Sequence, residues 1–435
     1  MNNNIQTLEE RRDFLARCTR CSQCKFVAVP KSQRHASACP SIDYGQLHAY
    51  SGGGQVIMGY SLIDGKATWS SEAQRAVSSC TMCGHCDSSC KINFGETVEP
   101  LDSLYALRVN MVKAGQSPAP HRTMIENLRS QGNTSGLPRS ERARWADGLR
   151  KPASARQTDV LIHVGSTLAY DRSRWASLRA VVEALQGAGI TVTHLGAEER
   201  PSGSTAFDLG YADDAKDFAR AMVEQVRRSG AGTLVTFSAQ AIAAFRAIYP
   251  RFGLGFGATR VLHITEYLVE LVRAGQLALN RPAMLQDDTV AYHDPCKLGR
   301  LSEPWRPHAP NLTSHMNGIL ASDDPSKLRF GNDGCYEPPR ELLRAMGLNV
   351  AELERHHASS YCCGGCGGVK ETVPEAAALA ARNRLAELAD TPTATLVSGC
   401  SGCSRHLGQH VDTATQVVDL LALVAQALQP AVATA

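Results

Sequence analysis

The chain has 435 residues, of which 43% are hydrophobic and 20% are charged. This is the composition of a globular protein with two or three domains. The 45 basic and 42 acidic residues leave a net charge of only +3, which is too balanced to indicate nucleic-acid binding. No apolar run reaches the ~20 residues of a membrane span, and the first residues show no secretory leader. The sequence therefore predicts a cytoplasmic protein, held peripherally on the inner membrane only through partners.

The cysteines are numerous and grouped. Of the 15 cysteines, eight lie between positions 18 and 90 and seven between positions 296 and 403. In a reducing compartment, such a number indicates metal binding or redox chemistry and argues against a disulfide framework.

Residues 1–115 are expected to form a helical domain. Apolar residues recur at three- and four-residue spacing over 7–17, 70–79 and 101–115, on either side of the cysteine runs, and this spacing is typical of short amphipathic helices. Residues 116–158 are rich in Pro, Gly, Ser and Arg, which indicates a linker with one or two short helices.

Two runs of cysteines in this first domain have the spacing of iron–sulfur ligands. CTRCSQC and, later, Cys39-Pro40 are followed by CTMCGHCDSSC. Three thiolates two residues apart can bind three corners of one cubane, while the fourth ligand comes from the other run. The pattern predicts two [4Fe-4S] clusters, one on Cys18, Cys21, Cys24 and Cys90, the other on Cys39, Cys80, Cys83 and Cys86. Zinc is the alternative, but zinc sites favour separated C-x2-C pairs.

From residue 159 the pattern changes to alternating strands and helices. Strands are expected near 159–166, 191–196 and 233–238, with helices over 172–189 and 212–232. The same order returns from 289 to 410, so the chain is expected to contain two copies of one α/β unit with parallel strands. We assign them to residues 159–285 and 286–435. The fold class is then α+β overall, a helical ferredoxin-like domain followed by two related α/β units. A final apolar helix is expected over 417–429, packed on the last unit.

The second unit carries HDPC, YCCGGCGG and CSGC at 293–296, 361–368 and 400–403. These motifs resemble the cysteine-rich CCG domain of the heterodisulfide reductase D-like proteins and of the iron–sulfur subunits of glycolate oxidase and anaerobic glycerol-3-phosphate dehydrogenase. The resemblance implies a third, non-cubane iron–sulfur cluster, in which an adjacent cysteine pair suits bridging thiolates. The implied ligands are Cys296, Cys362, Cys363, Cys400 and Cys403.

The match to the CCG pattern is incomplete. Residues 301–333 form an apparent insertion between the lone cysteine and the pair, Cys335 follows it, and Cys366 is extra. Whether Cys335 or Cys366 is a ligand stays open, and the alternative is a domain whose thiols bind zinc or nothing.

The first unit has lost the cysteines altogether. Where the pattern calls for them, this unit has other residues: Ser166, Pro201, Ser202, Ser238 and Ala241. We expect this unit to be a metal-free scaffold that shapes a pocket or a partner surface.

The resemblance implies an electron-transfer subunit. Its donor would be an FAD-dependent dehydrogenase subunit or an electron-transfer flavoprotein, since the chain shows no flavin or nucleotide fingerprint of its own. Its acceptor would be a quinone, a membrane partner or another carrier. The competing hypothesis is a heterodisulfide reductase-like thiol–disulfide reductase, and a weaker one is an iron or oxygen sensor. His293 and Asp294 are interpreted as a local hydrogen-bonded turn in preference to an acid–base pair.

Overall fold

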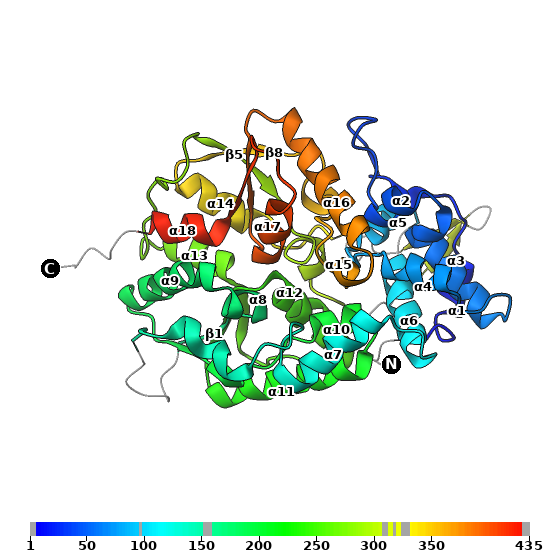
Figure 1. Cartoon of the computed structure of the whole chain (residues 1–435), viewed down its shortest axis with the longest axis horizontal. Coiled ribbons are helices and arrows are strands. Elements are labelled where there is room, and N and C mark those ends of the chain that lie inside the picture. The colour runs from blue at the N-terminus through cyan, green and yellow to red at the C-terminus, as the bar shows by residue number, and fades with distance from the viewer. Residues whose placement is uncertain are drawn as a thin grey trace.

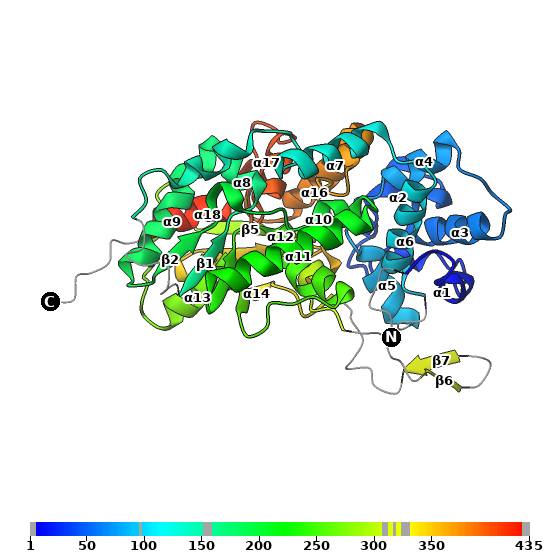
Figure 2. The same ribbon diagram turned by 90° about the horizontal axis from the view of Figure 1, so that it is seen from below.

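The computed structural model describes residues 6–94, 98–150, 159–306, 312–315, 319–322 and 331–428. The end of the predicted linker at 151–158 and, within the predicted insertion at 301–333, residues 307–311, 316–318 and 323–330 lie outside these residues. In the described part of the insertion, β6 (Leu312–His315) and β7 (Ile319–Ser322) form an antiparallel hairpin beside the main body (Figure 2). Among the described residues, no helix combines the length and the apolar character needed to cross a bilayer.

The N-terminal helices gather at one end of the molecule (Figure 1). They are α1 (Arg12–Ala16), α2 (Pro40–Gly45), α3 (Gly52–Ile63), α4 (Ser71–Ser78), α5 (His85–Phe94) and α6 (Pro100–Lys113). The predicted helical character of this region is thus confirmed, with α1 shorter than its periodic segment. The segment predicted as a linker contains α7 (Ala119–Gln131) and a 3-10 helix at Arg139–Ala146. The 3-10 helix packs on the first α/β unit, whereas α7 contacts α15 of the second unit and pairs with the first through Arg129 and Asp214.

The first α/β unit is a parallel four-stranded sheet with strand order β2-β1-β3-β4. Its elements are β1 (Val160–His163), α8 (Ser166–Tyr170), α9 (Trp175–Gly187), β2 (Val192–His194), α10 (Ser204–Asp208), α11 (Ala212–Ser229), β3 (Thr233–Thr236), α12 (Ala239–Ala243), β4 (Arg260–His263) and α13 (Ile264–Arg273). All four residues of β1 are buried, as expected for a strand with helices on both faces.

The second unit repeats this topology, with strand order β10-β9-β5-β8. Its elements are β5 (Thr289–His293), α14 (Glu337–Ala345), β8 (Asn349–Glu352), α15 (Val369–Thr372), α16 (Pro374–Ala386), β9 (Thr395–Ser398), α17 (Ser401–Gly408), β10 (Gln416–Asp419) and α18 (Leu420–Ala427). Read in reverse, the order matches the first unit strand for strand, so the repeat predicted from the sequence is confirmed.

Two details of the sequence interpretation were wrong. The segment predicted as one helix over 417–429 begins as strand β10, and only Leu420–Ala427 is helical. Strand β4 was not predicted either. Strands β4 and β10, the fourth in each unit, are short and are followed directly by a helix. The apolar spacing of the strand and that of the helix therefore merge into one apolar segment.

The two units pack through reciprocal helix pairs. Helix α9 of the first unit contacts α18 of the second, and α14 of the second contacts α13 of the first. In the repeat, α9 corresponds to α14 and α13 corresponds to α18. The contact between the units is therefore formed twice by equivalent pairs of helices. One apolar core runs through this contact and includes Val181, Leu268, Leu342 and Leu423. Helix α18 therefore packs on the first unit as well as on its own sheet.

A buried ion pair also joins the two units. The Nζ atom of Lys297, after β5, lies 2.7 Å from Oδ1 of Asp208 at the end of α10, and both side chains are almost fully buried. Removing one member of such a pair leaves the other charge buried without compensation.

We predict that Lys297→Met destabilises the folded chain by about 3–5 kcal/mol, because the Asp208 carboxylate loses the cation that contacts it. The matched control is Arg273→Met, which breaks the exposed inter-unit pair with Glu341 and has a much smaller effect. Anoxic thermal unfolding of samples with equal iron content measures both changes. Equal shifts in the two variants would contradict a stabilising role for the buried pair.

Candidate iron–sulfur sites

The structure brings the first predicted ligand set together. Cys18, Cys21, Cys24 and Cys90 line one small cavity with Gly53 and Pro100. Three of these cysteines come from the first run, and Cys90 reaches the same cavity from α5. All four are free thiols.

The second predicted set lines a separate cavity. Its cysteines are Cys39, Cys80, Cys83 and Cys86, with Gly52 beside them. Cys39 precedes α2, and Cys86 lies in the first turn of α5. The two groups of thiols are therefore placed in the crossed arrangement that the spacing predicts.

A glycine run separates the two cavities. A Cβ atom on Gly52 would lie 2.7 Å from Cβ of Cys86, and one on Gly53 would lie 3.2 Å from Sγ of Cys24. The Gly53 N–H also donates to Sγ of Cys24 at 3.2 Å. These residues begin α3, and the sequence interpretation missed them. The signal was present as the SGGG run at 51–54, because glycine permits close approach of the backbone to a ligand.

The donor set fits iron–sulfur clusters. Burial raises the pKa of the Cys39, Cys80 and Cys86 thiols, that of Cys80 to about 11. A thiolate is therefore unfavourable in these cavities unless a metal cation replaces its proton. Four thiols around a cavity, with glycines in place of side chains, provide the sulfur-only environment that such clusters need.

The C-terminal cysteines converge on the carboxyl ends of the strands in the second sheet. Cys296 follows β5, Cys400 and Cys403 begin α17 after β9, and Cys362 and Cys363 lie in the loop before α15. Cys296 Sγ lies 4.0 Å from Cys362 Sγ, and Cys363 Sγ lies 3.3 Å from Cys403 Sγ. The hydrogen-bonding neighbours Cys362 and Cys403 lower the pKa of Cys363 to about 5.

The two extra cysteines have different surroundings. Cys366 lies at the group, where a hydrogen bond from Cys296 lowers its pKa to about 7. Cys335 instead packs with Ala239, Ile242 and Leu298 and contacts the Thr265 hydroxyl at 3.6 Å. Of the two, Cys366 is the one that contacts Cys296.

The C-terminal cysteine group adjoins the second N-terminal cavity. The neighbouring Cys362 and burial together raise the pKa of the Cys83 thiol. Gly367 makes the approach possible, since its φ is +70° and a Cβ there would lie 2.7 Å from the Cys80 carbonyl oxygen.

Two buried arginines hold the cysteine loops against each other. Arg108 of α6 donates to the carbonyl oxygens of Cys80 at 2.6 Å and Gly367 at 2.8 Å. Arg300 donates to the carbonyl oxygens of Cys83 at 2.6 Å and Ser360 at 2.7 Å. Both were missed from the sequence, because a single arginine carries no local signal that it will be buried.

His293 and Asp294 are hydrogen-bonded, as expected, but not in a local turn. Arg340 of α14 donates to both oxygens of Asp294, at 2.7 and 2.9 Å, and both side chains are almost fully buried. Arg384 of α16 donates to Nδ1 of His293 at 3.0 Å. The Asp294 carboxylate is therefore committed to an ion pair.

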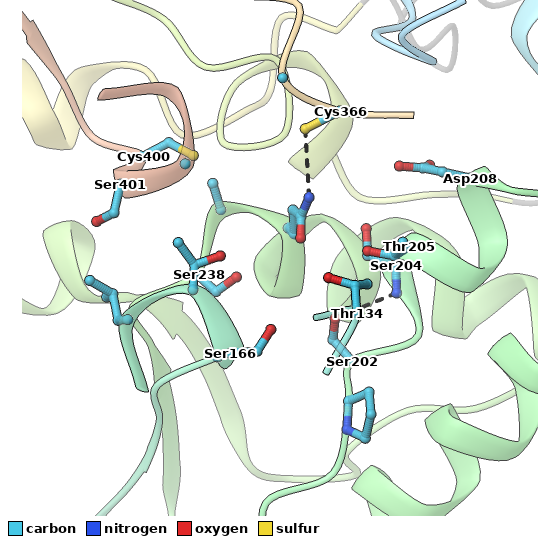
Figure 3. Close-up of a pocket in the computed structure, with 18 of the residues that line it drawn as sticks. Thr134, Ser166, Ser202, Ser204, Thr205, Asp208, Ser238, Cys366, Cys400 and Ser401 are labelled. Atoms are coloured by element: carbon cyan, nitrogen blue, oxygen red, sulfur yellow. Dashed lines mark hydrogen bonds between the residues drawn. The ribbon is translucent and has the colours of Figure 1, made fainter. Parts of the chain in front are cut away.

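The first unit supplies the opposite wall of a cavity of about 160 Å³ at the cysteine group. Figure 3 shows Ser166, Ser202 and Ser238 on one side and Cys366 and Cys400 on the other. The Nε2 of Gln240 lies 3.6 Å from Sγ of Cys366. Three of the five positions where the pattern calls for cysteines thus present serine hydroxyl groups on the wall opposite the remaining cysteines.

Comparison with protein families agrees with this division of the chain. Residues 14–94 match the 4Fe-4S dicluster domain, and residues 329–408 match the cysteine-rich domain.

Among curated proteins, the chain is 31% identical over 360 residues to the D-type subunit of the dihydromethanophenazine:CoB–CoM heterodisulfide reductase of Methanosarcina acetivorans, covering 81% of this chain and 78% of that protein. It is 28% identical to a probable membrane-anchored ferredoxin of Chromohalobacter salexigens, covering 85% of this chain and 49% of the relative. It is 26% identical to the probable iron–sulfur-binding oxidoreductase FadF of Bacillus subtilis, covering 80% of this chain and 46% of that protein.

The chain thus spans about half the length of two of these relatives and over three quarters of the third. The dicluster cavities, the CCG loop and this similarity agree: the chain belongs to the heterodisulfide reductase D-like family of iron–sulfur oxidoreductase subunits.

Proposed function

We propose that this chain carries electrons between a flavoprotein dehydrogenase, or an electron-transfer flavoprotein, and a quinone or another redox carrier. The contact between the Cys80–Cys83 loop and the Ser360–Gly367 loop carries the proposal, because it brings an N-terminal ligand set and the C-terminal cysteine group together inside the protein. A relative of this chain is named an EtfAB:quinone oxidoreductase (26% identical, in Syntrophomonas wolfei), which supports a flavoprotein donor and a quinone acceptor.

Three groups of thiols would hold the cofactors. Each N-terminal cavity would hold one [4Fe-4S] cluster. A non-cubane cluster would lie on the third group: Cys296, Cys362, Cys363, Cys400 and Cys403, with Cys366 adjacent. When bound, these clusters supply one-electron redox chemistry. Docking to a membrane partner on the cytoplasmic side is part of the same proposal.

The protein fixes the relative positions of the groups. Arg108 donates to the carbonyl oxygens of Cys80 and Gly367. Arg300 donates to those of Cys83 and Ser360. Both guanidiniums are permanently charged. They therefore lower the electrostatic cost of negative charge on the nearby thiolates as well as fixing the loops.

One observation favours a second candidate, a thiol–disulfide reductase. The cavity between the two units is bordered by Cys363, Cys366, Cys400 and Cys403, so a small molecule could reach the cysteine group directly. Reduction of a disulfide to two thiols takes up two electrons and two protons. Reduction of a quinone to a quinol has the same stoichiometry, so the acceptor distinguishes the two functions.

The first prediction from the proposed function concerns iron content. Anoxically purified protein is expected to contain about twelve irons, about eight of them from the N-terminal cavities. The Cys362→Ser Cys363→Ser variant should lose about four, because the bridging pair is gone. Iron and acid-labile sulfide analysis with EPR makes the measurement.

Cys335→Ser is the matched control and should retain all the iron, since Cys335 lies among apolar side chains. A wild-type count near eight would remove the third cluster from the proposal.

The second prediction concerns Gly52. Gly52→Ala should reduce iron content by about four, because the added methyl group would collide with Cys86 and disturb one cubane site. Gly232→Ala is the control, as a Cβ there meets no neighbouring atom. Full iron retention in Gly52→Ala would show that the cavity tolerates the methyl group and would refute the close-packing argument.

The third prediction separates the two functions. Protein reduced with dithionite and freed of the reductant is mixed with a short-chain quinone or with a low-molecular-weight disulfide such as cystine. Recovery of visible absorbance gives the oxidation rate. A relay should be reoxidised at least tenfold faster by the quinone, whereas faster reoxidation by the disulfide would overturn the relay and favour the reductase.

A further inference from the structure

One ring nitrogen of His293 has no role in the fold described so far. His293 ends β5 and is completely buried. Its Nδ1 accepts from Nε of Arg384, which is itself completely buried and paired with Glu387 at 2.8 Å. Among the described residues, Nε2 of His293 has no hydrogen-bond partner.

The Arg384 contact fixes the position of the imidazole proton. A guanidinium has only donors, so Nδ1 must present its lone pair. The proton of the neutral ring is then on Nε2. His293 lies beside Cys363 and Cys403, with one ring nitrogen and the two sulfurs all within 4.8 Å of one another.

This proton position distinguishes a hydrogen-bond donor from a metal ligand. A ligating histidine binds metal through an unprotonated nitrogen and usually gives its other N–H to a carbonyl or carboxylate. Here the other nitrogen receives a hydrogen bond from a cation, so the usual arrangement is reversed. His293 is therefore suited to donate Nε2–H to a thiolate and unsuited to bind iron.

The first unit provides an internal comparison. His163 ends β1 at the position that corresponds to His293, and its Nδ1 contacts the Thr236 hydroxyl at 2.9 Å. Its Nε2 lies 3.6 Å from Oε1 of Glu199. The repeat thus keeps the histidine where the cysteines are gone, and there the same ring nitrogen faces a carboxylate. The corresponding histidines thus lie beside two cysteine sulfurs in one unit and beside a carboxylate in the other.

We propose that His293 donates a hydrogen bond to the sulfur pair of Cys363 and Cys403 and so raises the reduction potential of the C-terminal centre. This inference rests on the proposed cluster there. A hydrogen bond to a ligand sulfur stabilises the more negative, reduced state of a cluster. Arg384 is the positioning residue that fixes the proton on the side of the sulfurs.

The test is an EPR-monitored redox titration of anoxic protein with an iron count on every sample. His293→Leu should make reduction of the C-terminal centre about tenfold less favourable, which is about 59 mV for a one-electron couple. His293→Gln retains an N–H and should restore part of the potential. His163→Leu is the matched control in the cysteine-free unit and should leave the potential unchanged.

The outcomes separate this inference from the proposed function. A wild-type protein without a third centre would overturn both. A third centre whose potential is the same in wild type and His293→Leu would overturn the inference alone. Iron loss in both His293→Leu and His293→Gln would also overturn it, because His293 would then be needed for binding and not for tuning.

Discussion

The arrangement of the molecule depends on burying cations where its parts meet. Arg108 and Arg300 each donate to both cysteine loops, and Lys297 pairs with Asp208 between the two α/β units. Carbonyl oxygens accept hydrogen bonds from the two guanidiniums without cancelling their charge. The loops thus meet at places where positive potential is retained, and such places suit anionic thiolate groups. The same contacts therefore hold the cysteine loops together and supply the positive potential beside the thiols.

The cysteine loops can meet only because glycines stand at the contact. Gly52 lies against Cys86 in one cavity, and Gly367 lies against the Cys80 carbonyl in the next. Any larger residue would push the sulfur groups apart, and electron transfer needs short gaps. The glycines of YCCGGCGG therefore allow close contact with the neighbouring domain as well as within their own loop. A contact between distant parts of the chain thus explains a local sequence pattern.

Much of this organisation could be predicted from the sequence, because its signals are local. Cysteine spacing grouped Cys90 with the first run, and strand periodicity revealed the repeat, since both depend only on neighbouring residues. The different surroundings of Cys366 and Cys335 could not be predicted, because they depend on contacts with residues far away in the chain. The burial of Arg108 and the tautomer of His293 likewise arise from contacts between residues far apart in the chain.

The reciprocal pairing of α9 with α18 and α13 with α14 has a consequence for biogenesis. The first unit keeps the strand order of the second without any of its cysteines, so this scaffold does not need metal to form its sheet and helix contacts. The other two parts of the chain are different, because their cysteines belong to the core: Cys24, Cys83, Cys86, Cys296 and Cys362 to one cluster, and Cys363 and Cys403 to another. The cysteine-free unit can therefore fold first, while the N-terminal block and the second unit complete their cores as cofactors are delivered.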